Sequence, residues 1–426
     1  MHVFPQLRRL ERKYRKELAV VGVHSAKFTT ERQTPHLARA VQRHQIQHPV
    51  VNDKQFQVWQ QYGVRAWPTL MFIDPAGKVV GRHEGEIPYE AADRLLADMV
   101  QEYDRAGLLD RRELSFLQAS TDEGRALSFP AKVLAHEASG RLLISDTNHD
   151  RIIWASLDGQ VRQVIGAGEP GFRDGSLNTA RFNQPHGLAL EGDTLYVADT
   201  ENHAIRRVDL SGGAVETIAG TGEQARMIYP SGKAREVPLN SPWDLVHQGG
   251  VLYIAMAGFH QLWALDLAAG QVFMFAGSGH EGIADGLRLQ AWLAQPSGIT
   301  TDGQTLYFAD SETSAIRMVG TGPDARVETI VGVDLFDFGD VDGPREQARL
   351  QHPLGVAYHE GVVYTADTYN NKIKQVFPQS RYSVTFLGTG EAGHRDGQGQ
   401  QAQFNEPGGL SFAGGRLYIA DTNNHA

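Results

Sequence analysis

The sequence contains no cysteine among its 426 residues. Disulfides, thiolate zinc sites, iron–sulfur clusters and thiol nucleophiles are therefore excluded for this chain. The sequence also has no apolar run approaching the ~18–20 residues that a membrane-spanning helix requires. Familiar catalytic signatures are missing too, since neither Gly-x-Ser-x-Gly, nor His-Glu-x-x-His, nor a phosphate-binding loop occurs. We therefore expect no membrane segment, no bound cofactor and no catalytic residue.

Charge is distributed unevenly along the chain. Residues 1–112 carry 18 Lys and Arg against 13 Asp and Glu, whereas residues 113–426 carry 22 against 37. Halves of opposite net charge are expected to prefer different partners. The negative excess of the second half argues against nucleic acid as its ligand, because nucleic-acid affinity depends on cations that neutralise phosphates.

From residue 129 onward, the sequence consists of six copies of one repeat, spaced 54 to 57 residues apart. Each copy begins at a proline: Pro130, Pro185, Pro242, Pro296, Pro353 and Pro407. Five copies then carry an aspartate after a short apolar strand: Asp146, Asp199, Asp310, Asp367 and Asp421. Within a copy, four short alternating segments are separated by turn residues, which is typical of four antiparallel strands.

A four-stranded unit of this size cannot bury both faces of its sheet alone, whereas several units stacked around an axis can. The repeats therefore predict an all-β six-bladed propeller over residues 129–426, with an incomplete last blade. The motif Pro-x-Gly followed by Tyr-x-Ala-Asp resembles the NHL repeat. This resemblance implies a propeller that binds proteins, RNA or small ligands, or that catalyses a reaction.

The recurring polar residues of the repeats are expected to be structural. We expect the five motif aspartates to accept hydrogen bonds from backbone donors in the turn that follows each of them. Aspartate-glycine loops at 171–175, 282–286, 339–343 and 393–397 favour turn chemistry over a cation site. His149, His186, His203 and His425 fall on different blades, so we predict no metal site. Met256 replaces the aspartate in the third copy, either by drift or because that blade has a special face.

Residues 1–106 show a different pattern, in which helical and strand segments alternate. The expected order is helix, strand, helix, strand, helix, hairpin and helix, at 3–14, 18–23, 35–45, 49–51, 56–62, 70–83 and 89–103. This order predicts an α/β sandwich, with the strand at 18–23 buried, and residues 107–128 form a linker.

The first domain resembles a thioredoxin fold, because Trp67-Pro68-Thr69 directly precedes a strand and matches that family's cis-proline loop. The resemblance implies that these three residues bind an extended substrate, although a turn that only shapes the sheet is an equal alternative. Pro5 matches the proline that follows the second cysteine of Cys-x-x-Cys by five residues, which places that cysteine just before Met1. We therefore expect a truncated domain that lacks its first strand and its Cys-x-x-Cys turn, in a fragment of a longer protein. The alternative is a variant whose last blade is closed by residues 113–117.

The combination of the two domains, with the segments 22–28, 48–53 and 67–70, resembles the NHL repeat-containing protein 2 family. That resemblance implies a parent that is a thiol–disulfide oxidoreductase with a protein-binding propeller, while this chain itself is redox-inert. A non-catalytic protein-interaction scaffold is the alternative. A lactonase-type propeller enzyme is a third hypothesis, and it requires a metal at the axis. We expect a protein partner on a face of the propeller and a cytoplasmic location.

Overall fold

The structure is a computed structural model that describes residues 3–112, 124–229 and 231–426. The chain divides into two compact units, residues 1–123 and residues 124–426. Each unit has its own cluster of buried apolar side chains. No helix in the described part of the chain is both long and apolar enough to cross a membrane.

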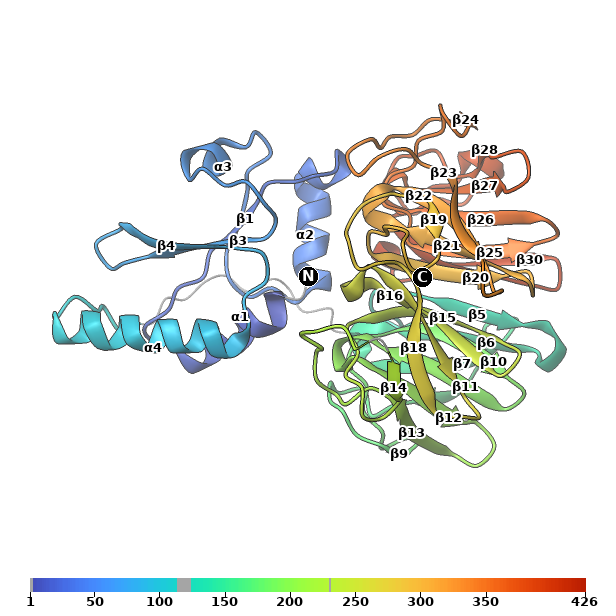
Figure 1. The fold of residues 1–426 in the computed structure, drawn as a ribbon, viewed down its shortest axis with the longest axis horizontal. Helices are drawn as coiled ribbons and strands as arrows, with labels where there is room; N and C mark the ends of the chain where they lie inside the picture. The colour runs from blue at the N-terminus through green and yellow to red at the C-terminus, as the bar shows by residue number, and fades with distance from the viewer. Residues whose placement is uncertain (1–2, 113–123, 230) are drawn as a thin grey trace. The chain divides into compact units, whose positions relative to one another are not determined.

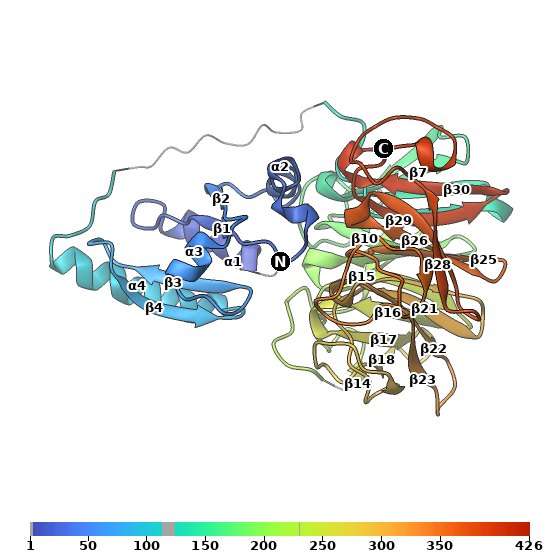
Figure 2. The same ribbon diagram turned by 90° about the horizontal axis from the view of Figure 1, so that it is seen from above.

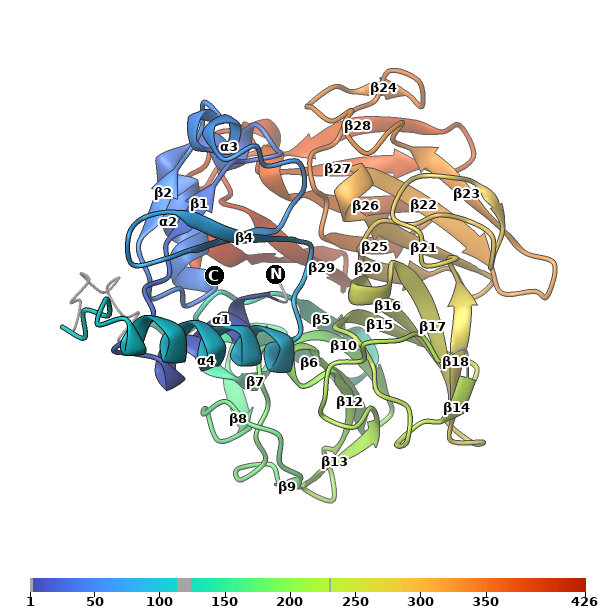
Figure 3. The same ribbon diagram turned by 60° about the vertical axis from the view of Figure 1, so that its left-hand side comes forward.

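The described part of the first unit, residues 3–112, combines four α-helices with two separate two-stranded sheets. In chain order its elements are α1 (Val3–Lys13), β1 (Gly22–His24), η1 (Thr30–Arg32), α2 (Thr34–Arg43), β2 (Val50–Asn52), α3 (Gln57–Gln61), β3 (Thr69–Ile73), β4 (Val79–Glu84) and α4 (Tyr89–Arg105). Strand β1 pairs with β2 in parallel, and β3 pairs with β4 as an antiparallel hairpin. Helix α1 lies beside α4 (Figure 3). Leu10 of α1 and Tyr14, just after it, pack in one apolar cluster with Ala92 and Leu96 of α4.

The predicted α/β sandwich is therefore only partly present. The element order agrees with the prediction, but the four described strands do not join into one central sheet. The strand expected at 18–23 begins only at Gly22, and the prediction that it is buried is wrong, because Val21 and Val23 are 55% and 44% exposed. Strand β1 has three residues and one hydrogen-bonded neighbour, so little of its surface is covered. Residues 113–117, the alternative closing strand, lie outside the described residues.

The second unit is a β-propeller built from short antiparallel sheets. Its strands are β5 (Val133–His136), β6 (Arg141–Asp146), β7 (Arg151–Ser156) and β8 (Val161–Ile165); β9 (Gly175–Ser176), β10 (Pro185–Glu191), β11 (Thr194–Asp199), β12 (Ala204–Asp209) and β13 (Ala214–Ala219); β14 (Ser231–Lys233), β15 (Pro242–Gln248), β16 (Val251–Met256), β17 (Gln261–Asp266) and β18 (Gln271–Ala276); β19 (Gly286–Leu287), β20 (Pro296–Thr301), β21 (Thr305–Asp310), β22 (Ala315–Gly320) and β23 (Arg326–Val331); β24 (Gly343–Pro344), β25 (Gly355–His359), β26 (Val362–Asp367), β27 (Lys372–Phe377) and β28 (Tyr382–Leu387); and β29 (Pro407–Ala413) with β30 (Arg416–Asp421). Short 3-10 turns are η2 (Glu137–Ser139), η3 (Thr147–His149), η4 (Thr200–Asn202), η5 (Ala257–Phe259), η6 (Ser311–Thr313), η7 (Thr368–Asn370), η8 (Gly399–Gln401) and η9 (Thr422–Asn424).

The prediction of six blades needs correction. The described residues form five complete blades of four or five strands, and the sixth repeat contributes only the two-stranded sheet of β29 and β30. The innermost strands β5, β10, β15, β20, β25 and β29 are neighbours in that order, and β29 lies against β5. The last strands, in red, thus meet the first strands of the ring, in green (Figures 1 and 2).

Successive repeats are joined at one recurring contact, which we call the junction latch. It connects the residue after each 3-10 turn to the residue before the proline of the next repeat. Both residues have positive φ angles, between 47° and 59° at all six junctions. The side chain of the first accepts the backbone N–H of the second: Asp150 with Gln184, His203 with Ser241, His260 with Gln295, Ser314 with His352, Asn371 with Glu406, and His425 with Phe129.

The residue types at the latch follow from its backbone conformation. Asn, Asp and His are the non-glycine residues that tolerate the left-handed region best, and five of the six acceptors are of these types. Each also carries an oxygen or nitrogen that can accept a hydrogen bond. The latch therefore selects residues that satisfy both requirements.

The ring closes between the sixth and first repeats through the same contacts as elsewhere. Thr422 Oγ1 donates to the Pro130 carbonyl at 2.8 Å, as Thr200 Oγ1 does to the Pro242 carbonyl at another junction. Ser411 Oγ accepts the Ala135 N–H at 2.9 Å, so side-chain hydrogen bonds of the described residues tie the two end repeats together.

The junction latch predicts different outcomes for two substitutions of His203. His203→Leu removes the acceptor of the buried Ser241 N–H, so we expect a loss of about 1–3 kcal/mol in the free energy of unfolding. His203→Asn supplies the acceptor type found at Asn371, so we expect a loss below about 1 kcal/mol. Urea denaturation measures both. Equal losses for the two variants would show that the acceptor is not what matters.

Candidate functional sites

The five motif aspartates hold the inner end of each blade. Each accepts, through Oδ1, the N–H of the residue two positions before the proline of its own repeat. The distance is 2.8 Å between Asn183 N and Asp199 Oδ1, and the other four are 2.6–2.7 Å. The donor expected in the following turn thus lies in the preceding loop. A turn pattern in sequence cannot reveal this, because the donor comes from a strand entry 16 to 18 residues earlier.

In three blades the same aspartate pairs with a buried cation on the next strand. Asp199 Oδ2 lies 2.6 Å from Arg206 Nη1, and both side chains are fully buried. Asp310 pairs with Arg317 at 2.9 Å, and Asp367 lies 3.7 Å from Lys374. Burial raises the pKa of Asp199 to about 6, although Arg206 and Asn202 favour its ionised form.

The aspartate-glycine loops contribute to this same cluster, which sequence reasoning missed. Asp174 accepts from Arg206 Nη2 at 2.9 Å and from Thr217 Oγ1 at 2.8 Å. Burial opposes the ionised form of Asp174, but the hydrogen bonds of Thr217 and the charge of Arg206 lower its pKa. Asp285 and Asp342 take the corresponding positions beside Arg317 and Lys374. These carboxylates therefore fasten the inter-blade loops and do more than shape turns.

The third repeat replaces the whole ion pair by apolar residues. Met256 stands where the aspartate is expected, and Trp263, seven residues later, stands where Arg206 lies in the second repeat. Both are fully buried in one apolar cluster, and Trp263 stacks on Phe259 at 5.6 Å. The departure at Met256 is therefore a compensated exchange inside the blade, and it creates no special face.

The four recurring histidines have separate contacts. His203 and His425 serve as latch acceptors, His149 Nδ1 lies 2.8 Å from Asp146 Oδ2, and His186 Nδ1 lies 3.0 Å from Thr200 Oγ1. Within residues 3–112, 124–229 and 231–426, no group of three or more His, Asp and Glu side chains is placed to hold a metal ion.

Two charged side chains meet on the propeller axis, and we call this pair the axial lock. Lys132 Nζ lies 3.2 Å from Asp244 Oδ2 and donates to the carbonyls of Ser297 at 2.9 Å and Leu354 at 2.7 Å. Asp244 accepts the N–H groups of Leu245 and Ile299. Burial raises the pKa of Asp244, and Lys132 opposes that shift. The lock joins four of the six repeats.

The sequence contains a signal for the lock that the motif description overlooked. The other four repeats carry glycine two residues after the proline, because a Cβ added there would lie 2.5–2.7 Å from an atom of the next repeat: Gly187, Gly298, Gly355 and Gly409. Lys132 and Asp244 occupy this glycine position in the first and third repeats. A lysine and an aspartate at a position that is otherwise glycine are therefore the sequence signal that predicts an ion pair on the axis.

Above the lock, the innermost strands of all six repeats enclose a cavity of about 330 Å³, which we call the axial funnel. It is lined by residues 132–134, 188–190, 244–247, 299–300, 355–359 and 410–412. A cavity of this size falls at the lower end of the range for small-molecule sites. No residue that we singled out from the sequence lines it.

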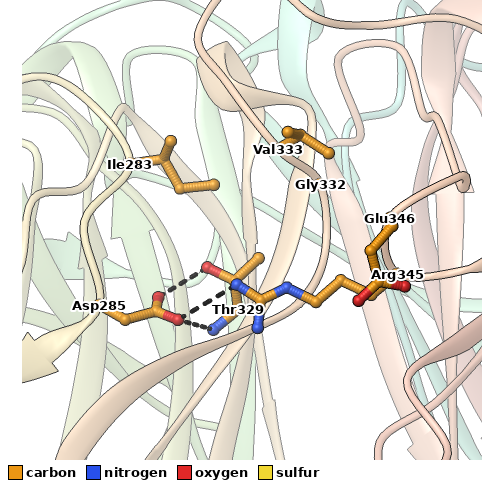
Figure 4. A pocket seen from close by; sticks show the side chains of 7 residues that line it. All are labelled: Ile283, Asp285, Thr329, Gly332, Val333, Arg345 and Glu346. Carbon is orange, nitrogen blue, oxygen red and sulfur yellow. Dashed lines mark hydrogen bonds and ion pairs between the residues drawn. The ribbon is translucent and has the colours of Figure 1, made fainter.

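A second cavity, of about 400 Å³, lies beside Asp285 on the outer part of the propeller (Figure 4). Asp285 accepts from Thr329 N and Oγ1 at 3.0 and 2.7 Å, and Arg345 Nη2 lies 3.5 Å from its Oδ2. Burial disfavours the charge of Asp285, while Thr329 and Arg317 lower its pKa. Asp285 is engaged by Thr329, Arg317 and Arg345, so we assign this cavity no ligand.

In the first unit, the peptide bond between Trp67 and Pro68 is cis. Trp67 Nε1 donates to the Ser25 carbonyl at 2.7 Å, and Ser25 Oγ donates to Asp53 Oδ2 at 2.8 Å. The Trp67 ring lies 4.5 Å from that of Trp59 and is 48% exposed. Thr69 Oγ1 donates to the Ala66 carbonyl at 2.7 Å, inside the loop. The loop therefore presents an exposed aromatic ring on a fixed support.

Comparisons with known proteins agree with this two-part organisation. Residues 1–79 match a family model described as thioredoxin-like, and residues 182–207 match the NHL repeat. The chain is 41% identical over 444 residues to Protein SUPPRESSOR OF QUENCHING 1, chloroplastic, of Arabidopsis thaliana. It is 38% and 39% identical over 462 residues to NHL repeat-containing protein 2 of Homo sapiens and Bos taurus.

These alignments cover 100% of this chain, but only 42% of the Arabidopsis relative and 64% of the human and bovine ones. The chain thus spans less than two thirds of the length of these relatives. Among solved structures, an auxiliary nutrient binding protein from Bacteroides thetaiotaomicron is similar with a TM-score of 0.52 and 14% identity, over 70% of this chain and 68% of that one. At this identity the similarity concerns the fold alone.

The buried ion pairs predict a non-additive response in the second repeat. Asp199→Met alone leaves Arg206 without its buried carboxylate, so we expect a loss of about 3–5 kcal/mol in the free energy of unfolding. The double variant Asp199→Met, Arg206→Trp reproduces the residues of the third repeat and should lose less than the single variant. Urea denaturation gives all three values. Arg207→Ala, in an exposed pair on the same strand, is the control and should cost under about 1 kcal/mol.

The axial lock predicts strong coupling between its two charges. Either single substitution, Lys132→Gly or Asp244→Gly, leaves the other buried charge without its ion-pair partner. Each should therefore cost about 3–5 kcal/mol in the free energy of unfolding. The double glycine variant carries the residue that four repeats already have at this position, and it should cost clearly less than the sum. A double-mutant cycle by chemical denaturation measures the coupling, and additive losses would contradict the lock.

Proposed function

Because the chain is homologous over its whole length to NHL repeat-containing protein 2, we propose that it works as a protein-interaction scaffold. The observation that carries this proposal is the combination of an exposed Trp67 loop and an axial funnel with the absence of any cysteine. Thiol–disulfide exchange proceeds by attack of a thiolate on a disulfide, and this chain has no sulfur nucleophile of that kind.

The propeller supports the proposal because its ring is fixed by contacts that do not depend on a ligand. Latches and paired charges hold each repeat to the next, so the face around the axial funnel is a rigid surface. Rigid surfaces with a central hollow lose little conformational freedom on binding a partner. We infer that the protein partner binds on this face.

The Trp67 loop is a second candidate surface, and a specific observation favours it. The Trp67 ring contacts the Trp59 ring and donates a hydrogen bond to the Ser25 carbonyl, yet about half of the residue is exposed. Together with Pro68 and Thr69 it borders the start of β3, where an extended segment of another protein could align. We propose that Trp67, Pro68 and Thr69 contact such a segment.

Thiol–disulfide exchange is proposed only for a longer protein that would contain this chain, and not for the chain itself. The resemblance to thioredoxin-like proteins implies thiol–disulfide exchange, which would require cysteines beyond this sequence. A cytoplasmic location also stays a prediction, and the Arabidopsis relative is named as chloroplastic.

Quantitative affinity capture with the immobilised full chain tests the scaffold proposal. We expect proteins recovered by the wild-type chain to fall at least fivefold with Phe412→Ala, which truncates the funnel mouth, or with Trp67→Ala, which truncates the loop. Phe336→Ala removes an aromatic ring that is 64% exposed and outside both surfaces, so recovery should not change. Equal recovery by all four chains would refute a role for either surface.

A further inference from the structure

The axial funnel has a chemistry that selects its occupant. We propose that it binds one neutral aromatic ring, presented as a side chain by the protein partner of the proposed function, on which this inference rests. The argument uses three features of the funnel: its floor, its wall and its volume.

The floor of the funnel offers no unpaired charge to a ligand. Lys132 has three N–H donors, and three acceptors surround it: Asp244 and the carbonyls of Ser297 and Leu354. Asp244 receives the N–H groups of Leu245 and Ile299 in addition to Lys132. A charged group that entered the funnel would lose its hydration without gaining a free counter-charge, which is costly. The floor therefore favours a neutral occupant.

The wall of the funnel combines aliphatic side chains close to the lock, aromatic rings near its mouth, and polar side chains between them. The polar side chains have partners: Thr300 Oγ1 accepts the Tyr358 N–H, Ser411 Oγ accepts the Ala135 N–H, and His247 Nε2 lies 3.3 Å from Glu191 Oε2. Leu188, Ile299 and Leu410 contribute apolar surface close to the lock. Farther out, His359 and Phe412 stack at 4.4 Å with an angle of 10° between their rings, and Tyr364 meets Phe412 edge-on at 4.7 Å.

Tyr358, on the same strand as His359, stacks on Tyr307 at 5.4 Å with an angle of 2°. Both Tyr358 and Phe412 line the funnel while held by rings of the neighbouring strands. Such fixed rings offer faces and edges to an incoming ring, and stacked or edge-to-face pairs contribute beyond the area they bury.

The volume of the funnel is sufficient for one aromatic ring system. About 330 Å³ accommodates an indole or a phenol with part of its attached chain, and it lies at the lower end of the range for small-molecule sites. The axial lock closes the inner end, so the ring must enter from the mouth. An aromatic side chain at a protruding turn of a partner fits these constraints.

Small probes test this assignment on the full chain. Indole and N-acetyl-tryptophanamide are neutral, whereas tryptamine and indole-3-acetate add one positive or negative charge to the same ring system. Ligand-observed NMR or calorimetry gives the dissociation constants, and we expect the neutral probes to bind at least tenfold more tightly than either charged one. Equal or tighter binding of a charged probe, or no binding of the neutral ones, would overturn the assignment.

Two aromatic truncations locate the binding site. Phe412→Ala should weaken indole binding at least fivefold, whereas Phe336→Ala, outside the funnel, should leave it unchanged. If Phe412→Ala lowers the melting temperature, Tyr358→Leu replaces a lining ring by an aliphatic group and gives a second reading. Unchanged indole binding in the Phe412 and Tyr358 variants would place the probe elsewhere and refute the proposal.

The outcomes also separate this inference from the scaffold proposal. If neutral probes do not bind but Phe412→Ala still lowers partner recovery, the scaffold proposal stands and the neutral ring is wrong. If the probes bind in the funnel while no variant alters partner recovery, the funnel is a small-molecule site and the assignment to a partner's side chain is wrong.

Discussion

Two backbone N–H groups at the entry of each repeat, one and two positions before the motif proline, need acceptors from outside their own strand. The motif proline has no N–H, the residue before it donates to the previous repeat, and the residue two positions before it donates to the motif aspartate in five repeats. Buried backbone donors need hydrogen-bond partners. The motif aspartate and the latch residue provide the acceptors for these two N–H groups. One acceptor comes from inside the blade and the other from its neighbour. Formation of a blade and its attachment to the ring are therefore coupled in a few residues around each proline.

Buried charge has a different role, because it is not common to all repeats. Asp199 with Arg206 and Asp310 with Arg317 are fully buried pairs, but Met256 with Trp263 fills the same place without charge. Replacing a buried ion pair by apolar residues of similar volume is often neutral or stabilising, so the pairs are not required for blade formation. Their geometry instead links the blade to the aspartate-glycine loop beside it, as Asp174 shows. The third repeat lacks that link, and its loop differs in sequence from those of its neighbours.

Sequence reasoning succeeded where a pattern recurs and failed where one residue departs from it. The regular spacing of prolines and aspartates was enough to predict a propeller, since repeated units must bury their sheets against one another. The sequence predicted six blades with an incomplete last one, whereas the described residues form five blades and the sixth repeat contributes only two strands. The donors to the aspartates were misplaced, because they are backbone N–H groups, whose contacts do not depend on the residue type at the donor position. The roles of Lys132 and Asp244 were not predicted, because the Pro-x-Gly motif describes only the four repeats that have glycine at this position. In the first unit, element order was readable, whereas strand pairing depends on neighbours that the local sequence does not specify.

The axial lock also determines which ligands the floor of the axial funnel can bind. A ring of six glycines would bring the repeats together at the axis without any polar group there. Two opposite charges instead close the axis and bind carbonyls of two further repeats, so the same residues stabilise the ring and form the floor of the funnel. Because every donor of Lys132 is already engaged in this closure, the floor cannot also recognise a charged ligand without opening the ring. Stability at the axis and a preference for neutral ligands therefore have one cause.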